Sequence, residues 1–364
     1  MSLLDKVKQN HDDFINNRIE YLPMPKQLGR ISEWLPGFTK FDVSAFTGTP
    51  SSGKTTLAKF IFLHNGVKWA VENNKDYHVL YFGLEEPEEG IDWSLLSYQL
   101  HRTKGVRYNI RDFTSVGSTV DPKHFPFIAE VEPKVDKIKS YVQYYDNIFN
   151  SFGIWKEVRD FARQRGKFYV GNTVLTSEQL ISGEKWERYE PNNPQEFVVV
   201  IVDHLLDMIP QKDEKDLAEA MNNVVKNLKN YAAKLFGYCV VFVQHQDNSV
   251  DNFERRQAQD ILCTIPNLAR NKELARQYKN LIGVTNINIT NSTNNNSGIQ
   301  NWNGYNIPSL GNFTRCINII KNRFGVKDVN ELLYFDGKVG LFDKLPQARS
   351  DEFKKLTEKV KQYI

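Results

Sequence analysis

Apolar residues along the chain follow two different periods, and segments with the two periods alternate. Short β-branched or aromatic runs predict buried strands at residues 41–47 ("FDVSAFT"), 77–86 ("YHVLYFGLEE"), 197–208 ("FVVVIVDHLLDM") and 237–246 ("GYCVVFVQHQ"). Apolar residues at helical spacing follow the first run from residue 54 onward and precede the last run over residues 217–235. Strands that alternate with helices in this way predict a mostly parallel sheet with helices on both faces.

The N-terminal segment differs from this α/β middle. Residues 1–31 are mostly polar and carry Leu3, Leu4, Val7 and Phe14 at roughly helical spacing, before the Pro/Gly-containing break "LPMPKQLGR". We predict an amphipathic helical arm here. It either packs on its own domain or docks on a neighbouring subunit.

Three later runs, "NLIGVTNINIT", "RCINIIKNR" and "NELLYFDGKVGLF", predict consecutive strands. The dipeptide Asp336-Gly337 predicts a hairpin within the last run. Residues 286–306, rich in Asn, Ser and Gly, predict a loop between the first two runs. Residues 88–195 are expected to be mainly helical.

Composition narrows the class of protein only slightly. The 364 residues are 40% hydrophobic and 25% charged, which suits one large globular domain or two small ones. There is no apolar run of about 18 residues and no apolar signal core at the N-terminus, so we expect no membrane span and a cytoplasmic protein. A net charge of +3 permits nucleic-acid binding without arguing for it. Cys239, Cys263 and Cys316 are too few and too far apart for a disulfide framework.

A phosphate-binding loop separates the first strand from its helix. The sequence matches G-x-x-x-x-G-K-[ST] at every fixed position, and the predicted nucleotide-binding residues are Gly48, Thr49, Pro50, Ser51, Ser52, Gly53, Lys54, Thr55 and Thr56. Lys54 is expected to reach the β- and γ-phosphates of a nucleoside triphosphate, and the Thr55 hydroxyl is expected to bind Mg²⁺. Motors, switches, kinases and recombinases share such a loop, so the loop does not tell what hydrolysis drives.

In an open parallel sheet the ligand lies beyond the carboxyl ends of the strands. The second predicted strand ends at Glu85 and Glu86, and we prefer Glu85 as the carboxylate that activates the attacking water. The third ends at Asp203, a predicted Mg²⁺ ligand, with Asp207 as a weaker rival. A pair of solvated acids, or an ordinary strand-end Asp, is the alternative explanation.

The fourth strand ends at Gln244, whose amide is predicted to contact the γ-phosphate or a water and to report its loss. His204 and His245 each follow a strand end, but two histidines without further ligands do not define a zinc site. We therefore expect positioning or packing roles for both.

Two cations, Lys321 and Arg323, lie two residues apart at the end of another predicted strand and so share a face. They suit a γ-phosphate, as an arginine finger does. They equally suit an edge strand that carries positive charge to prevent pairing.

The order of these motifs resembles the ATPase domain of the DnaB-type hexameric replicative helicases, and in particular of the phage-type members. "LPGFTKFDVSAFTGTPSSGKTT" is similar to their lead-in and Walker A block, "VLYFGLEE" to the strand with the catalytic glutamate, and "FVVVIVDHLLDM" to the Walker B block. "LKNYAAKLFGYCVVFVQHQ" is similar to the segment that ends in the sensor glutamine, and "IIKNRFG" to the block that reaches the neighbouring subunit's ATP. The likeness runs from about residue 32 to 346 and is patchy between about 100 and 195.

This resemblance implies a RecA-like P-loop NTPase core, α/β in class, with a mostly parallel sheet and a C-terminal antiparallel hairpin. It implies an ATP- and Mg²⁺-dependent DNA helicase in which Glu85, Gln244, Lys321 and Arg323 serve catalysis. The expected organisation is an arm over residues 1–31, the ATPase domain over 32–346 and a helical tail over 347–364. Since residues 1–31 are too few for the family's usual helical N-terminal domain, we expect this domain to be absent.

The expected partners follow from the same resemblance. They are single-stranded or forked DNA, further copies of the chain in a hexameric ring, and a separate primase or loader. In the family, DNA touches loops after the sensor strand, and the cations of that span here are Arg255, Arg256, Arg270, Lys272 and Arg276. Solvated helix faces are the alternative explanation for each cation. For the whole chain the alternatives are a RecA- or RadA-like recombinase or mediator, and an ATP-gated switch without motor activity.

Overall fold

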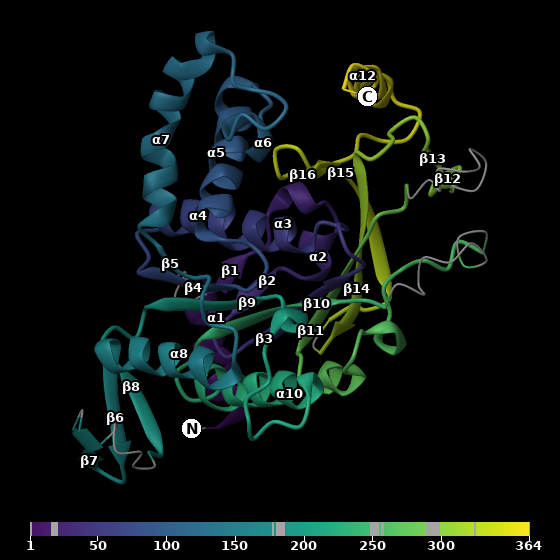
Figure 1. The fold of residues 1–364 in the computed structure, drawn as a ribbon. Helices are drawn as coiled ribbons and strands as arrows, with labels where there is room; N and C mark the ends of the chain where they lie inside the picture. The colour runs from purple at the N-terminus through teal and green to yellow at the C-terminus, as the bar shows by residue number, and fades with distance from the viewer. Residues whose placement is uncertain are drawn as a thin grey trace.

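The computed structural model describes residues 2–15, 21–176, 178–179, 186–247, 255, 258–288, 299–323 and 325–363. Its centre is a nine-stranded sheet in the order β16-β15-β14-β11-β3-β10-β9-β4-β5 (Figure 1). The six strands from β11 to β5 are parallel, as the alternation of strands and helices predicts. Their bounds are Val43–Gly48 for β3, Tyr77–Gly83 for β4, Val142–Tyr145 for β5, Phe197–Asp203 for β9, Cys239–His245 for β10 and Asn280–Thr285 for β11.

Three antiparallel strands complete the sheet beyond β11. They are β14 (Thr314–Asn322), β15 (Val329–Asp336) and β16 (Leu341–Lys344). The hairpin predicted at Asp336-Gly337 is present, and it joins β15 to β16 by a turn over residues 337–340. Since β14 runs against β11, it begins near the carboxyl edge of the parallel strands and ends at the opposite edge.

Helices cover both faces of the sheet. One face is covered by α3 (Lys54–Ala58), α4 (Gly66–Glu72), α5 (Glu88–Lys104) and α7 (Phe125–Lys139). The other face is covered by α8 (Ser151–Arg165) and α10 (Leu217–Asn227) (Figure 1). Both predicted helices contain a π-helical segment, η2 (Lys59–Asn65) between α3 and α4 and η5 (Leu228–Ala233) after α10.

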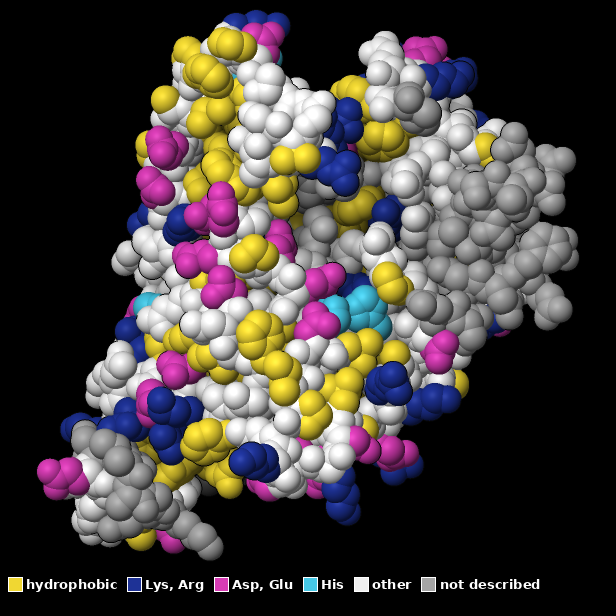
Figure 2. Space-filling view, viewed as in Figure 1, with side chains coloured by type: hydrophobic (Ala, Val, Ile, Leu, Met, Phe, Trp, Pro, Cys, Tyr) yellow, Lys and Arg dark blue, Asp and Glu magenta, His cyan; other side chains and the backbone are white. Residues whose placement is uncertain are grey.

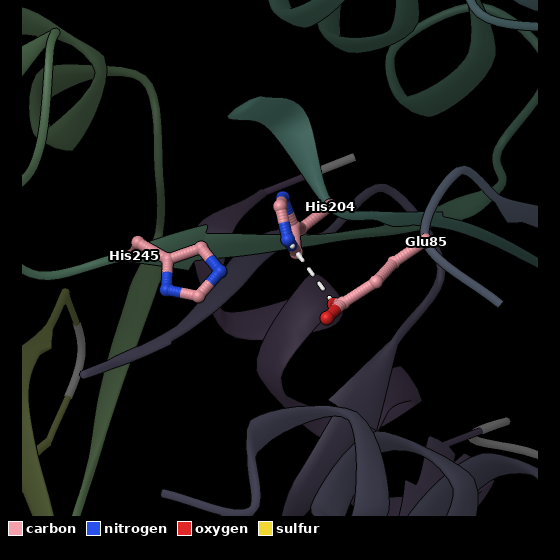
Figure 3. Close-up of side chains that lie close together, drawn as sticks. All are labelled: Glu85, His204 and His245. Carbon is pink, nitrogen blue, oxygen red and sulfur yellow. Dashed lines mark ion pairs between the residues drawn. The ribbon is translucent and has the colours of Figure 1, made fainter. Parts of the chain in front are cut away.

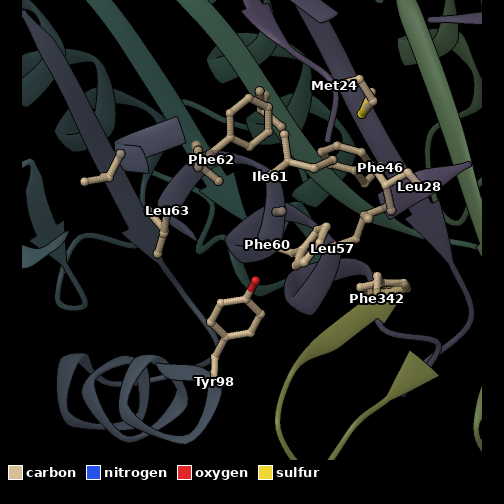
Figure 4. Close-up of a cluster of buried hydrophobic side chains, with 14 of the residues drawn as sticks. Met24, Leu28, Phe46, Leu57, Phe60, Ile61, Phe62, Leu63, Tyr98 and Phe342 are labelled. Carbon is tan, nitrogen blue, oxygen red and sulfur yellow. The ribbon is translucent and has the colours of Figure 1, made fainter. Parts of the chain in front are cut away.

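Aromatic and aliphatic side chains fill the space between the sheet and the helix that follows the phosphate loop. Phe46 of β3 packs with Phe62, and Phe60 packs on Tyr98 and Phe342 (Figure 4). Phe38 packs against both Phe46 and Phe62. These phenylalanines are fully buried, so truncating one to alanine would cost about 3–5 kcal/mol. This packing fixes the direction in which the helix leaves the phosphate loop.

The segment expected to be mainly helical contains strands as well. Besides α5, α7 and α8 it holds the short helix α6 (Ile110–Phe113), the edge strand β5 and a small antiparallel sheet. That sheet consists of β6 (Gly166–Val170), β7 (Thr173–Val174) and β8 (Arg188–Pro191). The prediction for residues 88–195 was therefore wrong in part, because these strands are short and partly exposed and lack a continuous apolar run.

The remaining elements lie at the two ends of the chain and beside the C-terminal hairpin. Helix α1 (Leu3–Ile15) exposes Leu3, Leu4 and Val7. Helix α12 (Asp351–Lys361) packs through Val360 on the sheet core. The short elements are β1 (Tyr21–Pro23), α2 (Ile31–Trp34), β2 (Gly37–Thr39), β12 (Asn301–Trp302) and β13 (Tyr305–Asn306). No helix in the described part of the chain has the length and apolarity that crossing a bilayer needs.

Candidate nucleotide-binding site

The phosphate loop runs from the end of β3 to the start of α3, as its motif requires. Gly53 has φ 99° and precedes Lys54, a conformation that strongly favours glycine. At Gly48 a Cβ atom would lie 2.3 Å from the carbonyl oxygen of Val284, so only glycine fits. Both fixed positions of the motif thus require glycine for a steric reason. The backbone N–H groups at the start of α3 have no partner within the helix and can bind an anion.

The Lys54 side chain lies folded under the loop. Its ammonium donates to the carbonyl oxygen of Thr49 at 2.9 Å and lies 3.4 Å from Nδ1 of His245. Burial lowers the pKa of Lys54 to about 8. A buried ammonium with one backbone acceptor is well placed to bind an anion that enters the loop.

Thr55 and Asp203 meet beside this lysine. The Thr55 hydroxyl donates to Oδ1 of Asp203 at 3.0 Å, and the Tyr81 hydroxyl donates to Oδ2 at 2.6 Å. Burial raises the pKa of Asp203 above its usual value, although these hydrogen bonds oppose the shift. A hydroxyl and a carboxylate oxygen are donors that Mg²⁺ prefers, so the residues present fit a magnesium ion here.

Glu85 and Glu86 are adjacent in sequence but have different surroundings. The Glu86 carboxylate pairs with the buried ammonium of Lys59 at 2.5 Å. The Glu85 side chain is 61% exposed and lies 3.1 Å from Nε2 of His204. Glu85 is therefore the carboxylate that can turn toward a ligand, whereas Glu86 is held by Lys59; the catalytic role of Glu85 stays a prediction.

Two hollows meet at Thr55, and Figure 2 shows this side of the molecule hollowed between the helical lobe and the C-terminal part. One, of about 310 Å³, is lined by Thr55, Tyr81, Gly83, Glu85, Glu86, Tyr144 and Asp203. The other, of about 340 Å³, extends from Thr55, Thr56 and Lys59 to α5, α6 and the β15–β16 turn. The first is rich in carboxylates, and the second, of nearly the same volume, is lined mostly by polar residues.

Gln244 lies at the end of β10 but faces away from Lys54. Its amide donates at 3.3 Å to the carbonyl oxygens of Ala269 and Asn271, and its oxygen accepts from the Tyr278 hydroxyl at 3.1 Å. The next residue, His245, is the one that contacts Lys54. Gln244 thus binds the loop on both sides of Arg270, and its sensing role stays a prediction.

Lys321 and Arg323 lie at the opposite end of the sheet from their own phosphate loop, where the parallel strands begin. Lys321 pairs with Leu281 near the start of β11, whereas the phosphate loop follows the end of the parallel strand β3. The Lys321 ammonium donates to the carbonyl oxygen of Ala275 at 2.8 Å, and its pKa is lowered by burial and by Arg323. The pair therefore does not reach the ATP site of its own chain.

The cations predicted to touch DNA are spread along the span after β10. Arg255 pairs with Asp260 at 3.0 Å, and Arg276 pairs with Glu273 at 2.8 Å. Lys272 begins a short helix and is exposed, and Arg270 lines a hollow with His204 and His245. Arg256 lies outside the described residues. Their contact with DNA stays a prediction.

Several side chains of the site carry no motif and were missed by the sequence analysis. Arg315, at the start of β14, is buried and donates to the carbonyl oxygen of Ser52 at 2.8 Å, so it braces the phosphate loop from behind. Tyr81 binds Asp203, and Lys59 binds Glu86. The position of Lys59, one helical turn after Thr55, was the one available signal.

Comparisons with solved structures agree with this architecture. The ATPase domain of one DnaB-like helicase matches with a TM-score of 0.64 at 14% identity, over 95% of this chain and 99% of that chain. A second DnaB-like replicative helicase, described together with its interactions with primase, matches with a TM-score of 0.62 at 14% identity, over 95% and 67% of the two chains. By sequence, no protein-family model and no curated protein matches this chain.

The chain therefore has the fold of a DnaB-like helicase ATPase domain, a RecA-like P-loop core. The mostly parallel sheet, the flanking helices and the antiparallel hairpin expected from the motif order are confirmed.

Proposed function

We propose that this protein is an ATP-hydrolysing DNA helicase that works as a hexameric ring, moves along single-stranded DNA and separates the duplex. The observation that carries the proposal is the meeting of Lys54, Thr55, Asp203 and Glu85 at one edge of the sheet. The fold shared with helicase ATPase domains supports coupling of hydrolysis to DNA.

Hydrolysis follows from what each side chain offers. The backbone of Gly48 to Thr56 holds the phosphates, and Lys54 leaves the Thr49 carbonyl for the β- and γ-phosphates. Thr55 and Asp203 hold Mg²⁺, which neutralises phosphate charge when bound. The Glu85 carboxylate orients the attacking water and accepts its proton. The hollow between α5, α6 and the β15–β16 turn takes the nucleoside.

The ring follows from the position of Lys321 and Arg323. Because they lie at the edge opposite to their own phosphate loop, they act at the ATP of the next copy of the chain. The exposed apolar side chains of α1 dock on a neighbouring subunit and help to close the ring.

Coupling to DNA runs through the loop after β10. Gln244 binds the backbone on both sides of Arg270, so a change at the ATP site moves a cation of the proposed DNA-binding set. The other members are Arg255, Arg256, Lys272 and Arg276. We further propose that the protein acts in DNA replication in the cytoplasm, that of a host if it is viral, with a separate primase or loader.

Strand displacement from forked DNA with tails of either polarity tests the proposal, with wild type compared to Lys54→Ala. ATP-dependent unwinding by wild type alone supports a helicase, and the preferred tail gives its polarity. Hydrolysis without unwinding, with or without a loader, would contradict it. Electron micrographs that show open filaments in place of closed rings would favour a recombinase.

A further inference from the structure

Three side chains with metal-binding atoms meet where neighbouring strands end. Gly83 of β4 pairs with Asp203 of β9, and Phe242 of β10 pairs with Val202 of β9. This register brings Glu85, His204 and His245 together although they are far apart in sequence. One ligand atom from each lies within 4.8 Å of the other two.

The ring nitrogens and the carboxylate converge on a common space (Figure 3). Nε2 of His204 lies 3.1 Å from the Glu85 carboxylate and 3.3 Å from that of Asp207. The rings of His204 and His245 are perpendicular, with centroids 4.2 Å apart. The space therefore has two imidazoles and one carboxylate on its walls, with a second carboxylate nearby.

The histidines are held in place while the glutamate can move. His204 is only 6% exposed, and its Nδ1 has no hydrogen-bond partner among the described residues. Nδ1 of His245 lies 3.4 Å from the Lys54 ammonium, so the other nitrogen of the ring is the one that faces the common space (Figure 3). Glu85 is mostly exposed and can close the remaining distance.

We propose that Glu85, His204 and His245 bind one divalent transition-metal ion of the zinc class, at a site separate from the Thr55–Asp203 magnesium site. Two imidazoles and one carboxylate are a donor set that suits such ions, whereas Mg²⁺ prefers oxygen donors alone. At zinc–ligand distances of about 2.0–2.1 Å the ligand atoms lie about 3.4 Å apart, so no pair of them has to approach by more than roughly 1.4 Å on binding.

The ion would inhibit hydrolysis, a consequence that rests on the proposed role of Glu85. A carboxylate bound to zinc is held away from the water that it would orient. Lys54, 3.4 Å from the other ring nitrogen of His245, repels the ion until a phosphate binds the ammonium. Binding to the ATP-loaded chain is therefore tighter than binding to the free chain.

Calorimetry with Zn²⁺ alone, on the metal-stripped full chain, tests the site directly. We expect one ion per chain with a Kd of about 10 μM or below. His245→Ala and Glu85→Gln change partly exposed or exposed side chains and should each weaken binding by at least about 30-fold. His11→Ala, at an exposed histidine of α1, is the matched control and should bind as wild type does. Co²⁺ in place of Zn²⁺ should give visible absorption that both site variants lose.

Binding weaker than about 100 μM, or binding that neither site variant reduces, would overturn the proposal. The second readout is ATP hydrolysis in excess Mg²⁺, with each protein compared to its own metal-free rate. Free Zn²⁺ held at about ten times its Kd should slow wild type about 10-fold and His245→Ala less than about twofold. Zinc binding without any ATP hydrolysis would contradict the proposed function and still support the metal site.

Discussion

Several charged side chains around the phosphate loop are buried, and each has a partner in the described structure. Lys59 is 7% exposed and pairs with Glu86, and Asp203 is bound by two hydroxyls. Removing one member of a buried pair leaves the other charge in a low dielectric, which costs more than the pair itself contributes. A substitution that removes one of these charges should therefore lower stability where the residue has a buried charged partner, and should lower catalysis where the residue acts on the ligand.

Glu85 and Glu86 provide the sharpest contrast at this scale. Glu85→Gln should lower kcat for ATP by about 10²–10⁴-fold with little change in KM or stability, because its carboxylate is mostly exposed and is proposed to act on the attacking water. Glu86→Gln should lower the free energy of unfolding by about 1–3 kcal/mol, because buried Lys59 loses its counter-charge. Steady-state kinetics and urea unfolding of both variants separate the two outcomes. A larger kcat loss for Glu86→Gln would reverse the assignment.

His64 predicts how stability depends on pH. It is buried, stacked on Tyr98 at a ring distance of 3.8 Å, and burial with nearby Lys59 lowers its pKa to about 3. In the unfolded chain its pKa is about 6.5, so below that pH the unfolded state binds a proton that the folded state excludes. His64 therefore leaves the free energy of unfolding unchanged above pH 6.5 and lowers it progressively as the pH falls toward 3.

Unfolding free energies at pH 7 and pH 5 measure this effect. The wild type should lose about 2 kcal/mol from this residue between the two, and His64→Asn should lose correspondingly less. The comparison is made between the two proteins because burial also lowers the pKa of His78, His101 and His245. An equal loss in both would show that His64 does not carry the dependence.

At the scale of elements, the sequence predicts those site residues that lie at the ends of strands with a clear apolar pattern. Apolar β-branched runs predict β3, β4, β9 and β10. Lys54, Thr55, Glu85 and Asp203 lie at or after the ends of these strands, and this position predicts them as site residues. Strand β5 and the β6–β8 sheet escape prediction because their residues are only partly buried, which leaves no apolar run. The proximity of Glu85 to both histidines also escapes prediction, because it depends on strand order and register, and these are not encoded locally.

Arg315 shows how the antiparallel strand β14 supports the phosphate loop. The guanidinium donates to the carbonyl oxygens of Ser52, Asn312 and Thr314 and lies 4.3 Å from the ring centroid of Phe335. Arg315→Met keeps the apolar contact but leaves these acceptors without their donor. We expect a loss of about 3 kcal/mol in the free energy of unfolding and a roughly 10-fold higher KM for ATP.

Urea unfolding and ATPase kinetics check this prediction. Lys327→Met, at an exposed cation beyond the end of the same strand, is the control and should change neither value. Unchanged kinetics in Arg315→Met would mean that the loop holds its shape without this brace.

At the scale of the whole molecule, the two halves of the proposed ATP site lie on opposite edges of one sheet. β14 runs against β11, so Lys321 and Arg323 emerge where the parallel strands begin, and the phosphate loop lies where they end. From the sequence, the two cations suit either an arginine finger or a protected edge strand. The topology favours action on a second copy, because no flexible side chain spans the length of a strand.

Mixing two inactive variants tests action between copies. Lys54→Ala removes the phosphate-loop lysine, and Arg323→Ala removes the proposed finger, so each alone should hydrolyse ATP at a few per cent of the wild-type rate or less. In a mixed ring, an intact site forms wherever a phosphate loop from an Arg323→Ala subunit faces a finger from a Lys54→Ala subunit. Random assembly at equal amounts makes about one quarter of the sites intact. We therefore expect the steady-state rate of ATP hydrolysis after co-assembly to recover toward one quarter of the wild-type rate.

A mixture of Lys54→Ala with Asp203→Ala is the control. It should recover no hydrolysis, because both changes fall on the same side of the interface. Recovery in neither mixture would show that each chain completes its own site, and full activity of Arg323→Ala alone would show that Arg323 takes no part in hydrolysis.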